Sequence, residues 1–322
     1  MPTPNITLAG SSQALDSSLP TIYSEFKLLR DDTGVMRQVS TKMTLEPHEG
    51  ATKNVNNYGR VIANNVADGA DISNAQALAD TTTSYTPGEV AVQVVLAGST
   101  MRRVQDPSLL ERTGRMLNNA YDLKEDTDGC AQLTSFTPIL GSAGTMISPG
   151  HMAAAAGRLR IGNDRTSPEP APEPHYAVLH PLHAVVLAGR IVPYTDVPTG
   201  TNAYGVNTGA HLGVTVGVGG TGSLGDDIIR RGPKALGTMA GLTIFTDANI
   251  AVDASDDASG AAFSKEGVIY VSELEPRMDA DDSDKSMRGA VELNVWGSYI
   301  WGLYRSANYG VELLFDASLP TS

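Results

Sequence analysis

Two stretches decide the fold of this chain. The first runs from STKMTLEPHEG (40–50) through a long polar region to GEVAVQVVLAG (88–98), and the second is DPSLLERTGRMLNNAYDLKEDTDGCAQLTSF (106–136). Residues 36–98 are rich in Asn, Asp, Thr, Ala and Gly and contain almost no large apolar residues in their middle. Such a region buries too little apolar surface to offset the entropy of ordering it. It is therefore either disordered or an arm that becomes ordered on neighbouring copies of the protein.

The two ends of this region have the pattern of strands. Val39–Leu45 forms the outgoing end, and alternating valines in 90–96 form the returning end. The middle, VADGADISNAQALADTTT (66–83), has the composition of a loop or a poor helix. The region as a whole predicts a long two-stranded hairpin, which would be marginally stable alone in water.

The second stretch predicts one long helix. Asp106 can cap it and Pro107 suits its first position. Gly114 and Gly129 oppose the helix by roughly 1 kcal/mol each. A narrow seam in steps of three and four predicts the buried face, which comprises Leu109, Thr113, Met116, Ala120, Leu123, Thr127, Cys130 and Thr134. The charged residues that we expect in solvent are Asp122, Lys124, Glu125, Asp126 and Asp128. An ordinary surface helix on a sheet would also fit.

Composition and charge exclude several classes of protein. The 322 residues are enough for one large domain or two medium ones. A net charge of -13 argues against binding nucleic acid by neutralising phosphates, and the pairs 102–103 and 230–231 are too short to form a basic groove. A single cysteine, Cys130, excludes an internal disulfide framework, and we expect it to be a small buried hydrophobe. No apolar run suits a membrane span, and the first residues lack the pattern of a signal peptide.

The rest of the chain predicts shorter elements. Leu15–Leu29 has the pattern of an amphipathic helix, with Leu19, Tyr23, Phe26 and Leu29 on one side. The other expected elements are a helix at Pro149–Leu159, a Pro/Glu connector at 167–175, a strand at Tyr176–Leu179, a helix at Pro181–Ala188, a loop at 199–225, a strand pair at Gly241–Phe245 and Gly267–Val271, and antiparallel strands around Val291–Val295, Tyr299–Tyr304 and Val311–Phe315.

Three motifs superficially suggest chemistry. GVGGTGSLG (217–225) lacks the Lys-Ser/Thr that ends a phosphate-binding loop. His180 and His183, with His175 nearby, lack a visible further ligand for a metal. MDADDSD (278–284) lacks the glycine and the bidentate glutamate of a calcium loop, which predicts an acidic turn. The sequence therefore predicts no catalytic, cofactor-binding or metal-binding residues, and no enzyme.

The order of these parts resembles the major capsid proteins of tailed phages with the HK97-type fold. STKMTLEPHEG to GEVAVQVVLAG resembles the family's E-loop, and 106–136 resembles its spine helix. YAVLHPLHAVVLAGR (176–190) and ALGTMAGLTIFTDANI (235–250) resemble parts of its A-domain, and SYIWGLYRSANYGVELLFDAS (298–318) resembles its final strands. The resemblance implies an α+β, HK97-like capsid fold.

The resemblance implies a division of the chain: an N-terminal arm (1–35), the E-loop (36–100), the spine helix with the first part of the P-domain (101–171), the A-domain (172–275) and the P-domain strands (276–322). It implies a major capsid protein that assembles as pentamers and hexamers into an icosahedral head, made in the host cytoplasm and located in the virion. No long helical segment precedes the arm, so a separate scaffolding protein is expected, with a portal, possible cement protein, and packaged DNA on the inner face.

Several alternatives remain. One is another virion part, such as a tail-tube or decoration protein, and another is an encapsulin-type shell. A soluble enzyme or ligand-binding protein with an unrecognised site would belong to a different class. Lys42 and Lys53 lie in the arm, but nothing assigns them to a cross-link.

Overall fold

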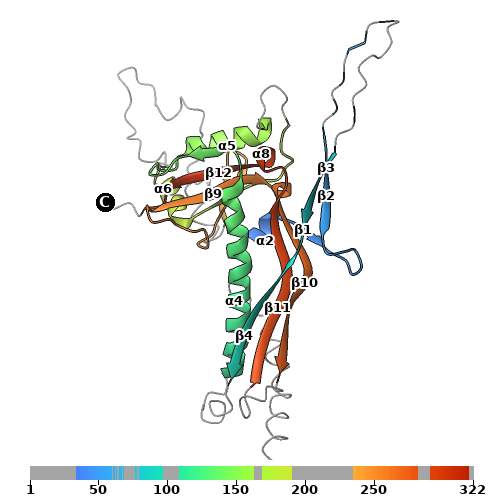
Figure 1. Ribbon diagram of the computed structural model, residues 1–322. Helices are drawn as coiled ribbons and strands as arrows, with labels where there is room; N and C mark the ends of the chain where they lie inside the picture. Colours follow the sequence, from blue (N-terminus) through green and yellow to red (C-terminus); the bar gives the residue numbers. More distant parts are fainter. Residues whose placement is uncertain are drawn as a thin grey trace, which may run out of the picture.

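The computed structural model describes residues 34–59, 80–96, 109–162, 169–190, 235–281 and 291–318, with isolated positions between 61 and 77. Helix α4 (Leu109–Ala131) lies along a four-stranded sheet in an elongated part of the molecule (Figure 1). A broader part at one end of α4 is built on a six-stranded sheet, and a two-stranded hairpin projects from the body. The mixture of helices and separate sheets confirms the expected α+β class.

The four-stranded sheet has the order β1-β10-β11-β4. Its strands are β1 (Thr41–Thr44), β10 (Val268–Asp281), β11 (Val291–Leu303) and β4 (Gly88–Leu96). The strands expected at both ends of the arm exist, but their pairing with each other is wrong. β1 is parallel to β10 at one edge, and β4 is antiparallel to β11 at the other. Pairing with the long central strands lets β4 turn its alternate valines toward the core under α4, which a partner as short as β1 could not provide.

The hairpin consists of two other strands. They are β2 (Lys53–Tyr58) and β3 (Asp80–Tyr85), and they are antiparallel. The region expected to be a loop (66–83) therefore includes the first four of the six residues of β3. Polar side chains join the two strands: Thr82 donates to Asn56 at 3.0 Å, and Ser84 donates to Asn54 at 2.7 Å. Cross-strand hydrogen bonds thus replace the apolar contacts of an ordinary sheet.

The predicted seam of α4 is wrong in most of its length. Met116 is 69% exposed and Leu123 is 48% exposed, and Ala120, Thr127 and Thr134 are exposed as well. Only Thr113 and Cys130 of the predicted seam are buried among the described side chains. Three carboxylates expected in solvent are instead buried, namely Asp122, Glu125 and Asp126, alongside Leu117 and Tyr121. Apolar periodicity failed because hydrogen bonds and an ion pair satisfy these acidic groups inside the fold.

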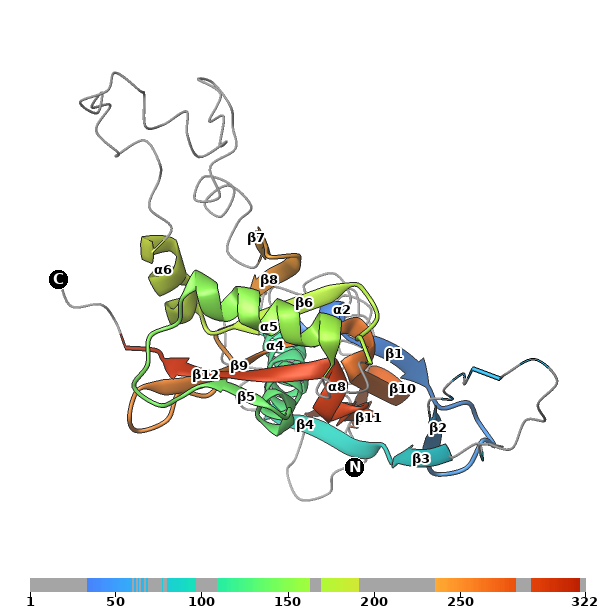
Figure 2. The ribbon, with the colours of Figure 1, turned by 90° about the horizontal axis from the view of Figure 1, so that it is seen from above.

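The six-stranded sheet carries the broader part of the molecule. Its order is β5 (Ile139–Gly141), β12 (Gly310–Asp316), β9 (Asp257–Ser264), β6 (His175–Leu179), β8 (Leu242–Thr246) and β7 (Ala235–Met239). Helix α5 (Pro149–Ile161) lies over this sheet (Figure 2) and buries Met152 and Leu159 against it. Ser148 caps α5, and helix α6 (Pro181–Arg190) follows β6 directly. The helices predicted at Pro149–Leu159 and Pro181–Ala188 and the strand predicted at Tyr176–Leu179 are confirmed.

The remaining helical segments are short. They are α2 (Met36–Val39), α8 (Ser306–Tyr309) and two 3-10 turns at Gln132–Ser135 and Lys265–Gly267. None of the helices in the described ranges combines the length and apolar character that a membrane span requires.

Two further expectations need correction. The strands near 241–245 and 267–271 exist, but β8 pairs with β6 and β7, whereas β10 pairs with β1 and β11. Sequence alternation identifies a strand but not its partner. The acidic turn expected at 278–284 is wrong for its first half, because β10 continues to Asp281.

Other expectations are only partly testable. The expected C-terminal strands are confirmed, although Val291–Leu303 forms a single strand. Residues 169–174 form the connector into β6, where Ala171 is buried against α5. The helix expected at 15–29 and the loop at 199–225 lie outside the described residues.

Candidate assembly surfaces

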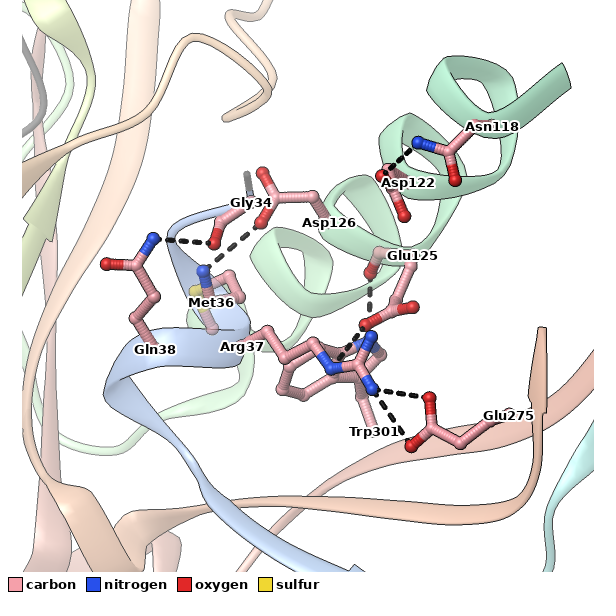
Figure 3. Close-up of polar contacts among 10 residues, drawn as sticks. All are labelled: Gly34, Met36, Arg37, Gln38, Asn118, Asp122, Glu125, Asp126, Glu275 and Trp301. Atoms are coloured by element: carbon pink, nitrogen blue, oxygen red, sulfur yellow. Dashed lines mark hydrogen bonds and ion pairs between the residues drawn. The ribbon is translucent and has the colours of Figure 1, made fainter. Parts of the chain in front are cut away.

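An ion-paired contact, which we call the spine junction, joins α2 to α4 and to the four-stranded sheet (Figure 3). The Arg37 guanidinium donates from Nη2 to both oxygens of Glu275, at 3.0 and 2.7 Å, and its Nε lies 3.5 Å from Oε1 of Glu125. Burial disfavours the charge of Arg37, but Glu125 and Glu275 outweigh it and raise its pKa. Trp301 Nε1 donates to the Glu125 carbonyl at 2.8 Å. The junction therefore holds a carboxylate that is only 5% exposed beside a fixed positive charge.

Asp126 ties three segments together beside the spine junction. Its Oδ1 accepts from the backbone N–H of Met36 at 3.1 Å (Figure 3), and its Oδ2 accepts from Asn249 Nδ2 at 2.8 Å. The backbone at Gly34 runs so close that a Cβ there would lie 2.3 Å from Asp126 Oδ1. The start of the described chain, the long helix and the loop after β8 thus meet at one carboxylate.

The close packing of α2 and β11 on α4 explains the presence of Gly129, a residue that is unfavourable in a helix on propensity alone. A Cβ at Gly129 would lie 2.9 Å from Met36 Cβ and 3.1 Å from Trp301 Cε2. Real Cβ atoms essentially never approach another heavy atom this closely without a shift of the neighbour. The glycine therefore lets α2 and β11 pack directly on the backbone of α4.

Among the described residues, Asp126, Cys130 and Asp247 bring donor atoms within 4.8 Å of one another, which would be close enough to hold a metal ion. Both oxygens of Asp126 already accept hydrogen bonds, and burial, followed by the neighbouring carboxylates, raises the pKa of the Cys130 thiol. A protonated thiol is a poor metal ligand. These contacts fit a structural tie better than a metal centre. Cys130 is buried as expected, although its surroundings include carboxylates.

Arg305 ties the hairpin to the body near the end of β2 that leads into residue 59. Its Nε donates to Asn57 Oδ1 at 2.5 Å and its Nη2 donates to the Tyr58 carbonyl at 2.7 Å. It also forms an ion pair with Glu169, which accepts from Asn308 at 2.7 Å. The backbone of Arg305 has a positive φ of 47°, a conformation that residues other than glycine adopt infrequently. Arg305, Asn57, Glu169 and Asn308 are among the residues that line an open cavity of about 410 Å³ between the hairpin and α8.

Tyr85 provides the second anchor of the hairpin. Its ring is buried, and its hydroxyl donates to the Leu303 carbonyl at 2.8 Å. Burial raises the pKa of this hydroxyl to about 12, so it remains a donor at physiological pH. The ring lies against the backbone at Gly302, where a Cβ would come within 2.2 Å of Tyr85 Cε1. The strand pair is therefore held at both ends, by Tyr85 at one and by Arg305 at the other, while most side chains of β2 and β3 are exposed.

The structure separates the residues that the sequence singled out for possible chemistry. His183 is fully buried with Nε2 3.1 Å from the Phe315 carbonyl oxygen, and its ring centroid lies 6.2 Å from that of His180. Burial lowers the pKa of both histidines. His175 instead has its Nε2 3.1 Å from the Ala171 carbonyl oxygen. Asp281 ends β10, and Asp282 and the glycine-rich loop lie outside the described residues. In the arm, Lys53 pairs with Glu49 at 2.5 Å.

Sequence reasoning missed the two arginines that organise the molecule. Arg37 lies far from Glu125 and Glu275 along the chain, and Arg305 lies far from Asn57. No local spacing connects such partners. The run of acidic residues on the predicted helix was a signal that such partners exist. When a helix with acidic residues around most of its circumference packs against the fold, some carboxylates are buried, and each of these needs a cation or a hydrogen-bond donor.

Comparisons with known proteins address the whole architecture. No family model matches the sequence, and none of the curated proteins matches it. Solved structures do match. The head structure of Helicobacter pylori bacteriophage KHP40 has a TM-score of 0.63 at 10% identity, over 89% of this chain and 93% of that chain. The chain has the HK97-type capsid fold.

Two other structures support the same fold. Mycobacterium phage Che8 matches with a TM-score of 0.59 at 17% identity, over 91% of this chain and 95% of the other. The holo-SrpI encapsulin complex from Synechococcus elongatus PCC 7942 matches with a TM-score of 0.53 at 11% identity, over 91% and 92%. The similarity thus spans about nine-tenths of this chain and of each matched chain.

Proposed function

We propose that this protein is a major capsid protein, whose copies assemble into the icosahedral head that encloses a phage genome. The observation that carries the proposal is the match to phage capsid and head structures over about nine-tenths of both chains. Under this proposal the protein is a structural component of the virion and not an enzyme.

The hairpin supports this proposal independently. Arg305 and Tyr85 hold its two strands at opposite ends, but the strands bury little apolar surface of their own. A rigidly aimed, largely polar projection gains little within one subunit, whereas contact with neighbouring copies would bury both of its faces. Obligate interfaces of this kind bury upward of about 2,000 Å² in total.

The proposal includes the division of the chain and its partners. Residues 1–35 form the N-terminal arm, 36–100 the E-loop, 101–171 the spine helix and first part of the P-domain, 172–275 the A-domain, and 276–322 the remaining P-domain strands. Copies associate as pentamers and hexamers, with a separate scaffolding protein, a portal and a possible cement protein. The net charge of -13 is consistent with an inner surface that faces DNA without binding it tightly.

The direct test is the size of the purified protein. We expect megadalton shells or capsomers by size-exclusion chromatography with light scattering, and icosahedral particles by electron microscopy. A stable monomer at 33.8 kDa under all assembly conditions, with or without scaffolding protein, would contradict the proposal.

A shortened hairpin provides the sharper test. Residues 59–79 can be replaced by an Asn-Gly turn, because Tyr58 and Asp80 face each other in the register of β2 and β3. This variant keeps Tyr85 and Arg305, so we expect the thermal stability of the unassembled subunit to be unchanged and shells to be lost. Normal particles from this variant would show that the distal hairpin does not join subunits.

The encapsulin match supports a second candidate, an encapsulin-type shell. The two differ in what the particle holds. Nuclease-resistant DNA in particles purified from the native source would favour the phage head, and particles without DNA would favour the encapsulin-type shell.

A further inference from the structure

Histidines from two helices gather at Phe315, a fully buried residue near the end of β12. His151 on α5 stacks on the Phe315 ring with 4.8 Å between the ring centroids, and His183 on α6 meets the same ring edge-on at 6.3 Å. His180 directly precedes α6, and its ring centroid lies 6.2 Å from that of His183. We call His151, His180 and His183 the histidine cluster. It joins the first turns of two helices to the end of one strand.

Two members of the cluster accept hydrogen bonds from backbone N–H groups where the helices begin. Nδ1 of His151 accepts from the backbone N–H of Ser148 at 3.2 Å, which completes the capping box of α5. Nδ1 of His180 accepts from the backbone N–H of Leu182 at 3.3 Å, at the start of α6. An imidazole nitrogen accepts a hydrogen bond only when it carries no proton. Both caps are therefore lost in the cationic form, which the positive end of a helix dipole also disfavours.

A different contact holds His183 in its neutral form. Its Nε2 lies 3.1 Å from the Phe315 carbonyl oxygen, and because a carbonyl can only accept, Nε2 carries the proton. Nδ1 of the neutral ring is then bare, and this buried nitrogen has no hydrogen-bond partner among the residues that the structure describes. A second proton would create a buried cation whose new N–H group lacks an acceptor, which is costly.

The charged groups around His183 do not remove this cost. Burial lowers the pKa of His183, although the carboxylates of Asp316 on β12 and Asp257 on β9 face the ring and favour its charged form. Each carboxylate already accepts a backbone N–H at 2.7 Å. From its own helix His180 faces His183, and a charge on either ring opposes a charge on the other. Burial lowers the pKa of His180 as well. From α5 the titratable group at Phe315 is His151.

We propose that the histidine cluster is an acid-sensitive latch, which fastens the starts of α5 and α6 to the end of β12 while its rings are neutral and releases them when the rings take up protons. Protonation removes two helix caps and charges a buried ring at one corner of the six-stranded sheet. Each ring that is neutral in the closed form and protonated in the open form raises the open population about tenfold at one pH unit below the ordinary histidine pKa of about 6.5. This inference goes beyond the proposed function, since it concerns a single subunit and holds whether or not shells form.

Hydrogen–deuterium exchange of the unassembled full-length subunit measures this release. Exchange rates are compared at about pH 7.5 and about pH 5.5, one unit on either side of the ordinary histidine pKa, after correction for the intrinsic effect of pH on exchange. At the lower pH we expect the N-terminal halves of α5 and α6 to lose protection by about tenfold or more, with a much smaller change in α4. Unchanged protection of α5 and α6 would overturn the proposal. An equal loss in α4 would also overturn it, because the subunit would then unfold as a whole.

A variant that keeps a cap but cannot take up a proton provides a second measurement. His180→Asn retains an acceptor at the N-cap of α6, a position where asparagine is among the preferred residues. Its protection should equal that of the wild type at the higher pH, and α6 should lose about tenfold less protection than the wild type at the lower pH. His48→Asn is the matched control, because His48 is exposed in the loop between β1 and β2 and this variant should respond to pH as the wild type does. The same pH response of α6 in His180→Asn and wild type would contradict the proposal.

Discussion

Replacement of Arg37 by Met should destabilise the unassembled subunit by about 2–4 kcal/mol. The Glu125 side chain is 5% exposed and would lose the guanidinium that lies 3.5 Å away. Removing one partner of a buried ion pair costs about 3–5 kcal/mol, because the other charge stays in a medium that solvates it poorly. The Arg37 side chain is itself 17% exposed, so water partly compensates the loss and lowers this range.

The second carboxylate of the spine junction contributes little to this value. The Glu275 side chain is 66% exposed, and an exposed ion pair contributes at most about 1 kcal/mol. Glu275→Gln is therefore the matched control: it removes the bidentate contact with Arg37 but leaves the buried pair intact. We expect this variant to lie within about 1 kcal/mol of the wild type.

Chemical unfolding monitored by tryptophan fluorescence measures these differences, since Trp301 donates directly to the Glu125 backbone. In the Arg37→Met background, Glu125→Gln should recover more than half of the lost stability, because it removes the uncompensated charge. Two results would contradict this reasoning. One is a free energy of unfolding for Arg37→Met within about 0.5 kcal/mol of wild type, which is roughly the scatter of such measurements. The other is a double variant that is no more stable than Arg37→Met alone.

The remaining predictions concern the faces of α4 and a buried histidine. Leu117→Ala should lower the free energy of unfolding by about 2–5 kcal/mol and Leu123→Ala by less than about 1 kcal/mol, because the first side chain is buried and the second is half exposed. Equal losses in urea unfolding would contradict this assignment of the buried and exposed faces of α4. Gly129→Ala should destabilise the protein by about 1–2 kcal/mol despite the gain in helix propensity, because the added Cβ would collide with Met36. Gly157→Ala should stabilise it by up to about 1 kcal/mol, because a Cβ there meets no neighbour within 4 Å. Calorimetry that ranks the two variants the other way would refute the close-packing explanation. Burial lowers the pKa of His183 in the folded protein, so the contribution of its neutral form to stability is complete above the ordinary histidine pKa of about 6.5 and is lost as the pH falls through the pKa of the folded state. His183→Gln should therefore make the free energy of unfolding less dependent on pH below about 6.5. An unchanged slope of that free energy against pH would contradict this prediction.

Local sequence patterns were sufficient where a segment's own residues decide its conformation. The strand at 176–179 is a continuous apolar run and forms a buried strand, and Pro149 and Pro181 begin helices as their fixed φ favours. The long helix was predicted from its start signals and length, and it forms. The resemblance to the capsid fold likewise depended on the order of such elements along the chain.

Local sequence patterns could not predict which strands pair or which side of α4 is buried. β1 and β4 were expected to pair, yet each lies beside a different strand from the C-terminal part of the chain. The outward orientation of Leu123 and the burial of Glu125 reverse the apolar pattern, because Arg37 supplies a compensating charge from a distant segment. Hydrophobic periodicity predicts the buried face only when the polar face has no internal partner.

The sequence by itself determined the elements, their order and the polar character of the projecting arm, since these follow from backbone preferences, apolar spacing and composition. Only the tertiary structure decided which strands are neighbours, which side of α4 is inside, and where the hairpin is anchored. Those outcomes depend on contacts such as Arg37 with Glu125 and Arg305 with Asn57, between residues far apart in the chain. The free energy of a buried ion pair or hydrogen bond depends on the surroundings of both partners, and those surroundings exist only once the chain has folded.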